Sequence, residues 1–423
     1  MRLRACLLAI AVVVPTRAFA QTPPPAAPPP PPPAVEAAPP PAAPPPPAAA
    51  PAPMAPPAAA PAPAAAPAGP SPKFVFGGLV DTYYMYNFTP PSGDNSLQFP
   101  QPPVGVGRAF DLNANSINLA LAKLTMNASL DVVSLQIDMG YGQTGSIINN
   151  AVDPNGSLAS PVPPSFLLEQ AYGEISLPGN LTLDFGKFTT TAGAEVIEAN
   201  KNWLYSRSLL FNAIPLLHTG VRANLKINDM VTVQASVVNG WNNDPDLNAW
   251  KTIGLSGTFT VSPALSLIGT VYFGKEGQPQ PVPTGATPGD LRFLLDIVAA
   301  YTVNSNFGLN LNFDYIKAFD DIAADYQVGG SLMGRYVIND HFNVAARGEF
   351  LASHYSAPGG IPMPETVKQG EGTIMLGIDV GKNFELRPEV RADFAGKVMG
   401  VDVLQGGNKS NAVTGEIAAL TWF

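Results

Sequence analysis

The chain has 423 residues, of which only 13% are charged, and its formal net charge is −9. This acidic balance argues against a nucleic-acid partner, because such binding needs a basic surface that displaces counterions from phosphates. After the N-terminal segment no run of about eighteen apolar residues occurs, which argues against transmembrane helices. The composition therefore favours an all-β protein with one polar and one apolar surface.

Residues 1–20 have the pattern of a secretory signal peptide. Arg2 and Arg4 precede a short apolar run, and residues 18–20 form a small-x-small cleavage site. Cys6, the only cysteine, lies within this segment. The pattern predicts an exported bacterial protein whose mature chain has no thiol for a disulfide, a metal or a nucleophile.

Residues 21–72 consist almost entirely of proline and alanine, and Glu36 is their only charged residue. Such a segment cannot bury a core, so we expect an extended polyproline II arm of about 3.1 Å per residue in the periplasm. Two roles remain open for this arm. It is either a simple spacer or a segment that contacts the peptidoglycan wall.

The rest of the chain, residues 73–423, repeats one pattern. Segments that alternate apolar and polar side chains are connected alternately by very short turns and by long loops, which is typical of an outer-membrane barrel. In residues 384–394 five charged side chains share one face: Glu385, Arg387, Glu389, Arg391 and Asp393. That face must be wet and the opposite face apolar, so the predicted fold class is an all-β, transmembrane antiparallel β-barrel.

About sixteen strands are predicted, an even number as bacterial barrels require. Their expected ranges are 74–88, 115–127, 129–141, 167–177, 180–188, 217–228, 230–240, 250–261, 263–274, 290–302, 305–316, 325–338, 340–353, 371–381, 383–396 and 411–423. Strand 115–127 is the least regular, because Lys123 shares the face of Leu119 and Leu121, and its turn is expected at residues 128–129. A barrel of this width leaves an aqueous channel.

The chain ends in Phe423, which closes an alternating strand. A terminal phenylalanine in this position predicts recognition by the outer-membrane barrel-insertion machinery. The other expected partners are outer-membrane lipid and lipopolysaccharide.

Residues 189–215, called the insert below, break the strand alternation between two amphipathic strands. The insert carries charged and aromatic side chains within a short span: Glu195, Glu198, Lys201, Trp203, Tyr205 and Arg207. We expect it to be partly helical, to fold into the bore of the barrel and to form the constriction.

Parity along the strands places further basic side chains on the lumen face: Arg222, Arg335, Arg347, Arg387 and Arg391. The last four are predicted to form a basic wall opposite Glu195 and Glu198. Opposed charges across a narrow, water-filled gap would set a transverse field that screens solutes by size and charge. The alternative is that these are solvated lumen residues held in salt bridges.

No catalytic or metal-binding motif is found. The histidines His218, His341 and His354 form no metal-ligand pair, and no nucleophile or nucleotide motif follows a strand. We therefore expect no enzymatic activity, no metal and no cofactor.

A dense set of motif positions lies in residues 184–241: Gly186-Lys187-Phe188, Gly193, Glu195, Glu198, Asn202, Tyr205-Ser206-Arg207-Ser208, Phe211, Pro215, His218-Thr219-Gly220-Val221-Arg222 and Asn239-Gly240-Trp241. With these residues the chain resembles the β-barrel porin-2 family, the OmpL-like outer-membrane proteins, over residues 74–423. The resemblance implies a porin-like channel in the bacterial outer membrane. Analogy with porins of this size adds the expectation of a homotrimer.

The sequence thus predicts an outer-membrane channel for the passive diffusion of small hydrophilic solutes, narrowed by the insert. The alternative function is structural, an outer-membrane anchor that the Pro/Ala-rich arm tethers to the cell wall.

Overall fold

The computed structural model describes residues 71–90, 107–152, 165–246, 248–276, 290–318, 325–355, 365–397, 402, 404 and 409–423. The expected signal peptide lies outside these ranges, and so does the expected arm except for Ser71 and Pro72. Their assignment therefore stays a prediction.

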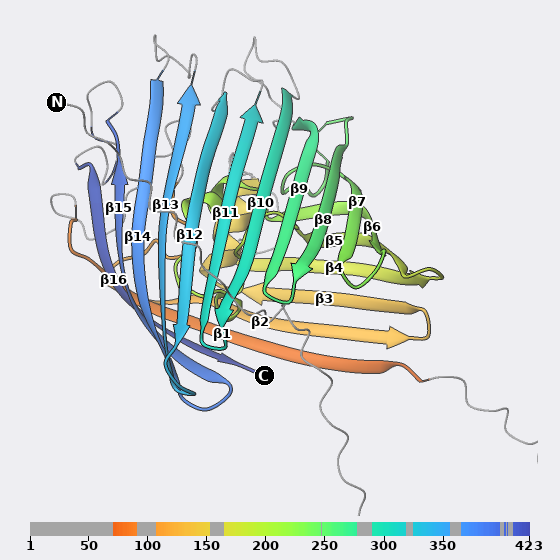
Figure 1. Ribbon diagram of the computed structural model, residues 1–423, viewed down its shortest axis with the longest axis horizontal. Helices are drawn as coiled ribbons and strands as arrows, with labels where there is room; N and C mark the ends of the chain where they lie inside the picture. Colours follow the sequence, from red (N-terminus) through yellow and green to blue (C-terminus); the bar gives the residue numbers. More distant parts are fainter. Residues whose placement is uncertain are drawn as a thin grey trace, which may run out of the picture. The chain divides into compact units, whose positions relative to one another are not determined.

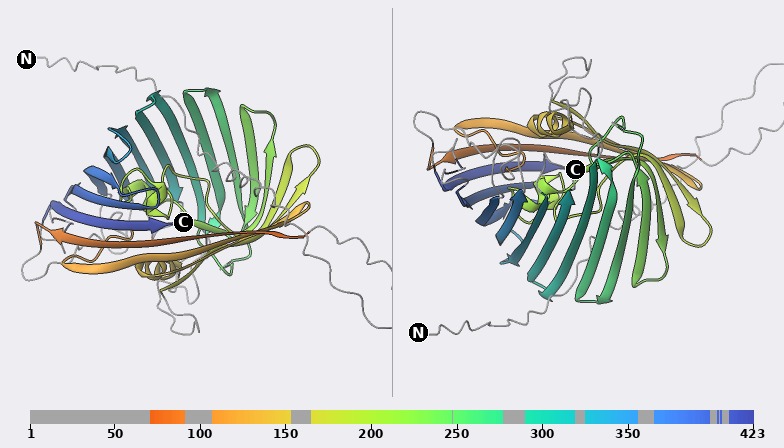
Figure 2. Two further views of the ribbon diagram at one scale, coloured as in Figure 1. Left: turned by 90° about the horizontal axis from the view of Figure 1, so that it is seen from below. Right: turned by 90° about the horizontal axis from the view of Figure 1, so that it is seen from above.

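Sixteen antiparallel strands form a closed barrel, which confirms the predicted fold class (Figures 1 and 2). Each strand pairs with its neighbours in the sequence and β1 pairs with β16, so that no sheet edge is left unpaired in the lipid. The strands are β1 (Lys73–Asn87), β2 (Ser116–Leu130), β3 (Val133–Tyr141), β4 (Phe166–Leu177), β5 (Leu181–Thr189), β6 (Leu217–Lys226), β7 (Val231–Val238), β8 (Thr252–Ser262), β9 (Leu265–Glu276), β10 (Asp290–Asn304), β11 (Phe307–Ala318), β12 (Tyr326–Val337), β13 (Phe342–Tyr355), β14 (Glu365–Asp379), β15 (Phe384–Ala395) and β16 (Asn411–Trp422).

The two faces of the wall differ as the alternation predicts. Apolar side chains such as Leu255, Ile374 and Val390 are more than half exposed on the outer face. Glu389 and Arg391, the sequence neighbours of Val390, are buried on the inner face. This pattern fits a barrel with lipid outside and polar groups inside.

The seam between the first and last strands is closed by the C-terminal residue. The Phe423 amide donates to the Gly78 carbonyl at 3.1 Å, and the Gly78 amide donates to the Phe423 carbonyl at 3.2 Å. The Phe423 ring lies against Gly78, where a Cβ atom would collide with it. Its expected recognition by the insertion machinery stays a prediction.

The connection between β2 and β3 corrects two details of the expected strands. The turn lies at residues 131–132, because Asp131 adopts a φ of 53°, a conformation that aspartate tolerates. On β2 the register shifts, so that Leu119 and Leu121 lie opposite consecutive residues of β1. This bulge turns Leu119 outward and leaves Lys123 buried on the inner face.

Helical structure is limited to three short elements in the described part of the chain: α1 (Gln143–Val152), η1 (Ala199–Lys201) and α2 (Leu209–Ala213). The last two lie within the insert, which confirms that it is partly helical. Ser208 caps α2, because its side chain accepts a hydrogen bond from the Phe211 amide at 2.9 Å. No helix among the described residues is long and apolar enough to cross a membrane.

Candidate functional site: the insert inside the barrel

The insert lies inside the barrel and rests against strands on several sides (Figure 2). On β9, Thr270 Oγ1 donates to the Thr191 carbonyl at 3.2 Å. On β11, the side-chain oxygen of Asn312 accepts from the Ala194 amide at 3.2 Å. These contacts confirm the expected inward fold.

Apolar packing holds the two ends and the middle of the insert to the wall. The first cluster joins the insert to β9, β10 and β11 through Ala192, Ile214, Tyr272, Leu294 and Ile316. A second cluster joins the insert to β12, β13 and β14 through Leu204, Met333, Ala345 and Met375. The insert is therefore a packed part of the barrel interior rather than a free loop.

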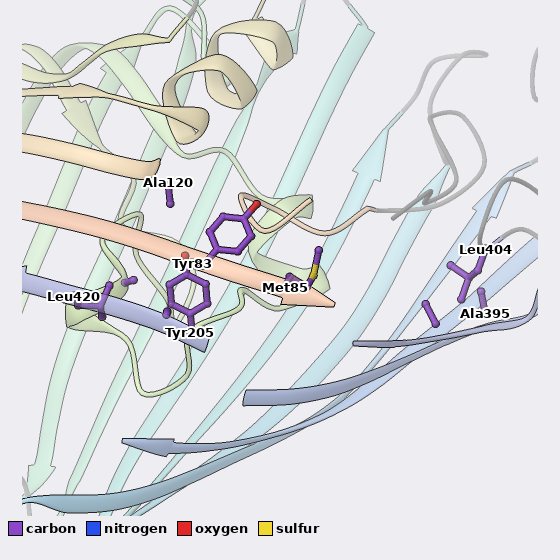
Figure 3. Packing of buried hydrophobic residues seen from close by; sticks show 10 residues of the cluster. Tyr83, Met85, Ala120, Tyr205, Ala395, Leu404 and Leu420 are labelled. Atoms are coloured by element: carbon purple, nitrogen blue, oxygen red, sulfur yellow. The ribbon is translucent and has the colours of Figure 1, made fainter. Parts of the chain in front are cut away.

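Tyr205 anchors the insert to β1. Its hydroxyl donates to Asp81 Oδ1 at 3.0 Å, and its ring packs on Tyr83 with centroids 5.9 Å apart. Figure 3 shows the two rings side by side next to Leu420 of β16. This aromatic residue thus packs the insert onto the wall.

Three arginines of the wall bind backbone carbonyls of the insert. Arg347 Nη1 donates to Ser206 at 2.8 Å. Arg387 Nη1 donates to Ala199 at 2.7 Å and to Asn202 at 3.0 Å, and Arg391 Nη1 donates to Arg207 at 2.5 Å. These bonds tie backbone carbonyl groups of the insert to the wall.

Carboxylates of the same wall bind the amide groups of the insert. Glu389 accepts from Tyr205 at 2.8 Å and from Ser206 at 3.2 Å. Glu349 accepts from Leu209, at the start of α2, at 2.5 Å. Sequence parity had placed Glu389 on this face, but its role as an anchor of the insert depends on a contact between distant parts of the chain.

Two features of the predicted basic wall are wrong. Acidic residues interleave with the arginines, since Glu349 lies opposite Glu371, and Glu371 lies opposite Asp393. No water-filled gap separates Arg347 from the insert, because its Nη1 is 2.8 Å from Glu195 and both side chains are at most 4% exposed. The charges pair directly because Glu195 of the insert lies on this wall and not across from it.

The predicted partner of Glu198 is also wrong. Glu198 pairs at 2.6 Å with Lys123 of β2, which also pairs at 2.8 Å with Glu169. Lys201 pairs with the same Glu198 oxygen at 2.6 Å, and its side chain is 57% exposed. Burial alone would raise the pKa of Glu198, but Lys123 and Lys201 lower it to about 2. The bulge on β2 brings Lys123 to this position, and strict alternation could not show it.

The remaining predicted site residues lie at three separate places. Arg207 is buried within the insert, where it donates to the carbonyls of Val196, Ile197 and Tyr205. Arg222 pairs with Asp184 at 2.7 Å on the neighbouring strand. Arg335 bonds to Asn343 at 3.2 Å. Arg207 thus supports the fold of the insert, while Arg222 and Arg335 bond to neighbouring strands.

A second inward segment, residues 107–115, was missed by the sequence analysis. Arg108 is fully buried there and donates to Thr414 at 2.8 Å, with Asp393 and Glu416 at 3.6 Å. The ring of Phe110 lies 5.4 Å from the guanidinium of Arg207. No alternation or motif marks this loop, so only the lone arginine could have suggested it. In the described part of the chain, no cluster of three side chains suited to a metal ion is found.

Comparison with known proteins agrees with this architecture. The family model described as "Putative beta-barrel porin-2, OmpL-like" matches residues 73–423. No curated protein sequence matches the chain.

Three solved structures illustrate the similarity in fold. The outer membrane channel DcaP of Acinetobacter baumannii is 14% identical with a TM-score of 0.54, over 85% of this chain and 99% of that one. An anion-selective porin from Comamonas acidovorans is 11% identical with a TM-score of 0.54, over 84% and 100%. The trimer form of in-vitro folded OmpT of Vibrio cholerae is 11% identical with a TM-score of 0.53, over 84% and 100%.

Proposed function

The chain belongs to the β-barrel porin-2, OmpL-like family of outer-membrane channels, and from that premise we propose that it lets small hydrophilic solutes diffuse passively past the insert. The observation that supports this proposal most directly is the insert itself, bonded to the inner wall of a closed barrel. A constriction that is held by many contacts keeps a constant width, as passive selection by size requires.

Lys201 offers a direct test, because its side chain is largely exposed inside the barrel although Glu198 binds its amino group. In planar bilayers we expect wild-type channels of defined conductance and a lower conductance for Lys201→Trp, whose indole fills part of the passage. Lys382 is an exposed lysine in the turn between β14 and β15, so Lys382→Trp is the matched control and should conduct like the wild type.

The two possible failures of this test have different meanings. Wild-type protein that forms no channels would refute the channel. Equal conductance of the wild type and Lys201→Trp would instead refute the insert as the constriction, and deletion of residues 194–208 would then also leave the conductance unchanged.

We further propose that the chain assembles as a homotrimer, since a trimer form is among the structures that share its fold. The molar mass of the detergent-solubilised barrel, measured by light scattering, tests this directly. The alternative role as a cell-wall anchor depends on residues 21–72, nearly all of which lie outside the described ranges, and it stays a prediction.

A further inference from the structure

Charge is distributed unevenly around the inner wall. On β13, β14 and β15, the side chains of Arg347, Glu371 and Arg391 are 0% exposed, and the two arginines bond to the insert. By contrast, β7 and β8 contain no aspartate, glutamate, lysine or arginine at all. The arginines that hold the insert are therefore not accessible from the lumen, and β7 and β8 bring no charge to it.

The inner face of β7, β8 and β9 is accessible on the side of the short turns, whereas Ser236, Val238 and Thr252 further from these turns are buried. The outward residues of these strands are apolar and exposed, for example Val237, Leu255 and Phe259. The inward residues on the side of the short turns include the apolar Ile268, which lies opposite Thr258. Six others carry a hydroxyl or an amide and are exposed or half-buried: Thr232, Gln234, Ser256, Thr258, Thr260 and Ser266. We call these six residues the neutral face.

The insert contacts β9 further from the short turn between β8 and β9 than the neutral face does. It bonds to Thr270, which lies opposite Ser256, and Tyr272 is the next inward residue of β9 away from the short turn. Thr258, Thr260 and Ser266 lie on the other side of that contact, towards the short turn. The neutral face thus extends from the contact between the insert and β9 towards the short turn.

Charges next to the neutral face are already paired. Arg222 of β6 lies opposite Ser236 of β7, and its guanidinium bonds to Asp184 at 2.7 Å and lies 4.3 Å from the centroid of the Phe188 ring. Lys226 of β6 lies opposite Thr232, and its amino group is 2.7 Å from Asp229. A solute beside the neutral face therefore meets no unpaired charge from these groups.

We propose that solutes pass along the neutral face and that the channel favours uncharged, polyhydroxylated small molecules over ions of equal size. Hydroxyl and amide groups exchange hydrogen bonds with a hydroxylated solute in place of its water, at little net cost. A charged solute loses part of its hydration in a narrow passage and finds no opposite charge there in return. This proposal depends on the passive channel proposed above.

Liposome swelling with the purified full barrel tests the solute class. Glucose, glucuronate and glucosamine have rings of equal size and differ in charge, so we expect glucose to enter fastest. In a KCl gradient we expect a reversal potential near zero. Entry of either charged sugar at the rate of glucose, or strong selection for one ion, would overturn the inference while the channel itself stands.

Two glutamines allow a matched test of the path. Gln234 of β7 and Gln136 of β3 are each the fourth residue of a strand that follows a short turn, and both are half-buried. Gln234 donates to Asn224 at 2.7 Å and Gln136 donates to Asp138 at 2.8 Å. Only Gln234 belongs to the neutral face, and its partner is a neutral amide where the partner of Gln136 is a carboxylate.

We expect Gln234→Lys and Gln234→Glu to shift the K⁺/Cl⁻ permeability ratio in opposite directions, each by about threefold, as expected for one new charge a few ångströms from the ion in water. The same changes at Gln136 should give smaller shifts. Opposite signs at one position cannot come from damage to the fold, which would change both variants alike. Equal shifts at the two positions would overturn the assigned path, whereas a wild type without channels would refute the proposed function as well.

Discussion

The replacement of Arg347 by methionine tests whether the wall arginines hold the insert. Arg347 donates to the Ser206 carbonyl at 2.8 Å and to Glu195 at 2.8 Å, and its side chain is 0% exposed. Methionine keeps most of the side-chain length but has no donor. The variant leaves the Glu195 carboxylate and the Ser206 carbonyl without this partner inside the barrel.

The expected size of the effect follows from this geometry. Removal of one member of a buried ion pair typically costs about 3–5 kcal/mol, because the other charge stays buried. A loss of about 3 kcal/mol makes local opening of the insert about 100-fold more frequent. Arg387 and Arg391 still bind the insert at Ala199 and Arg207, so we expect the barrel to stay folded and the insert to stay mostly docked.

Hydrogen exchange of the insert amides measures this opening directly. The Ser206 and Ser208 amides, which donate to Glu389 and Glu195, should exchange about 100-fold faster in Arg347→Met, while the strand amides should not change. Arg335→Met is the matched control, because Arg335 lies on the neighbouring strand and bonds to Asn343. Unchanged exchange in Arg347→Met, or an equal increase in the control, would refute the account of the wall as an anchor.

Three further variants test other parts of the structure. Gly186 has a φ of 132° and a Cβ there would collide with the Ala171 carbonyl, so Gly186→Ala should cost more than about 1 kcal/mol and lower the unfolding temperature of the barrel. Arg108→Met should speed hydrogen exchange in residues 107–115 but not on the neutral face, since the buried arginine bonds to β16. The pKa of Glu198 is lowered from 4.5 to about 2, so its contribution to insert docking is complete above about pH 4.5 and is lost as the pH falls towards 2. The free energy of insert opening, derived from exchange, should therefore differ between the wild type and Glu198→Gln by a constant amount from pH 7 to 5, and the difference should shrink below pH 5. A difference that already shrinks between pH 7 and 6 would contradict the assigned pairing.

The strands could be predicted because lipid and water impose opposite demands on alternate residues, and a period of two records this in the sequence. The same rule failed at β2, where one bulged residue reverses the parity and brings Lys123 to Glu198. A bulge leaves a mark only as an irregular pattern, and it does not say which face the next residue takes. The irregularity of this strand was visible, but its consequence was not.

The site could be predicted only in part. Parity showed that Arg347, Arg387 and Arg391 face inward, but it could not show what meets them, because that depends on how a loop without periodicity folds. The contribution of Arg108 was missed for the same reason. Arg207, which binds three carbonyl groups, looks in the sequence like an arginine without any partner.

The position of the insert explains why the wall carries both signs of charge where it does. A loop that crosses the barrel interior has few ladder partners, so its carbonyl and amide groups need donors and acceptors from the wall. Arg387 supplies donors to the Ala199 and Asn202 carbonyls, and Glu389 supplies acceptors to the Tyr205 and Ser206 amides. Strands β7 and β8 lie beyond these contacts and carry no charge. On β15 the charges of the inner wall therefore hold the insert, and the uncharged strands β7 and β8 form the side on which we propose that solutes pass.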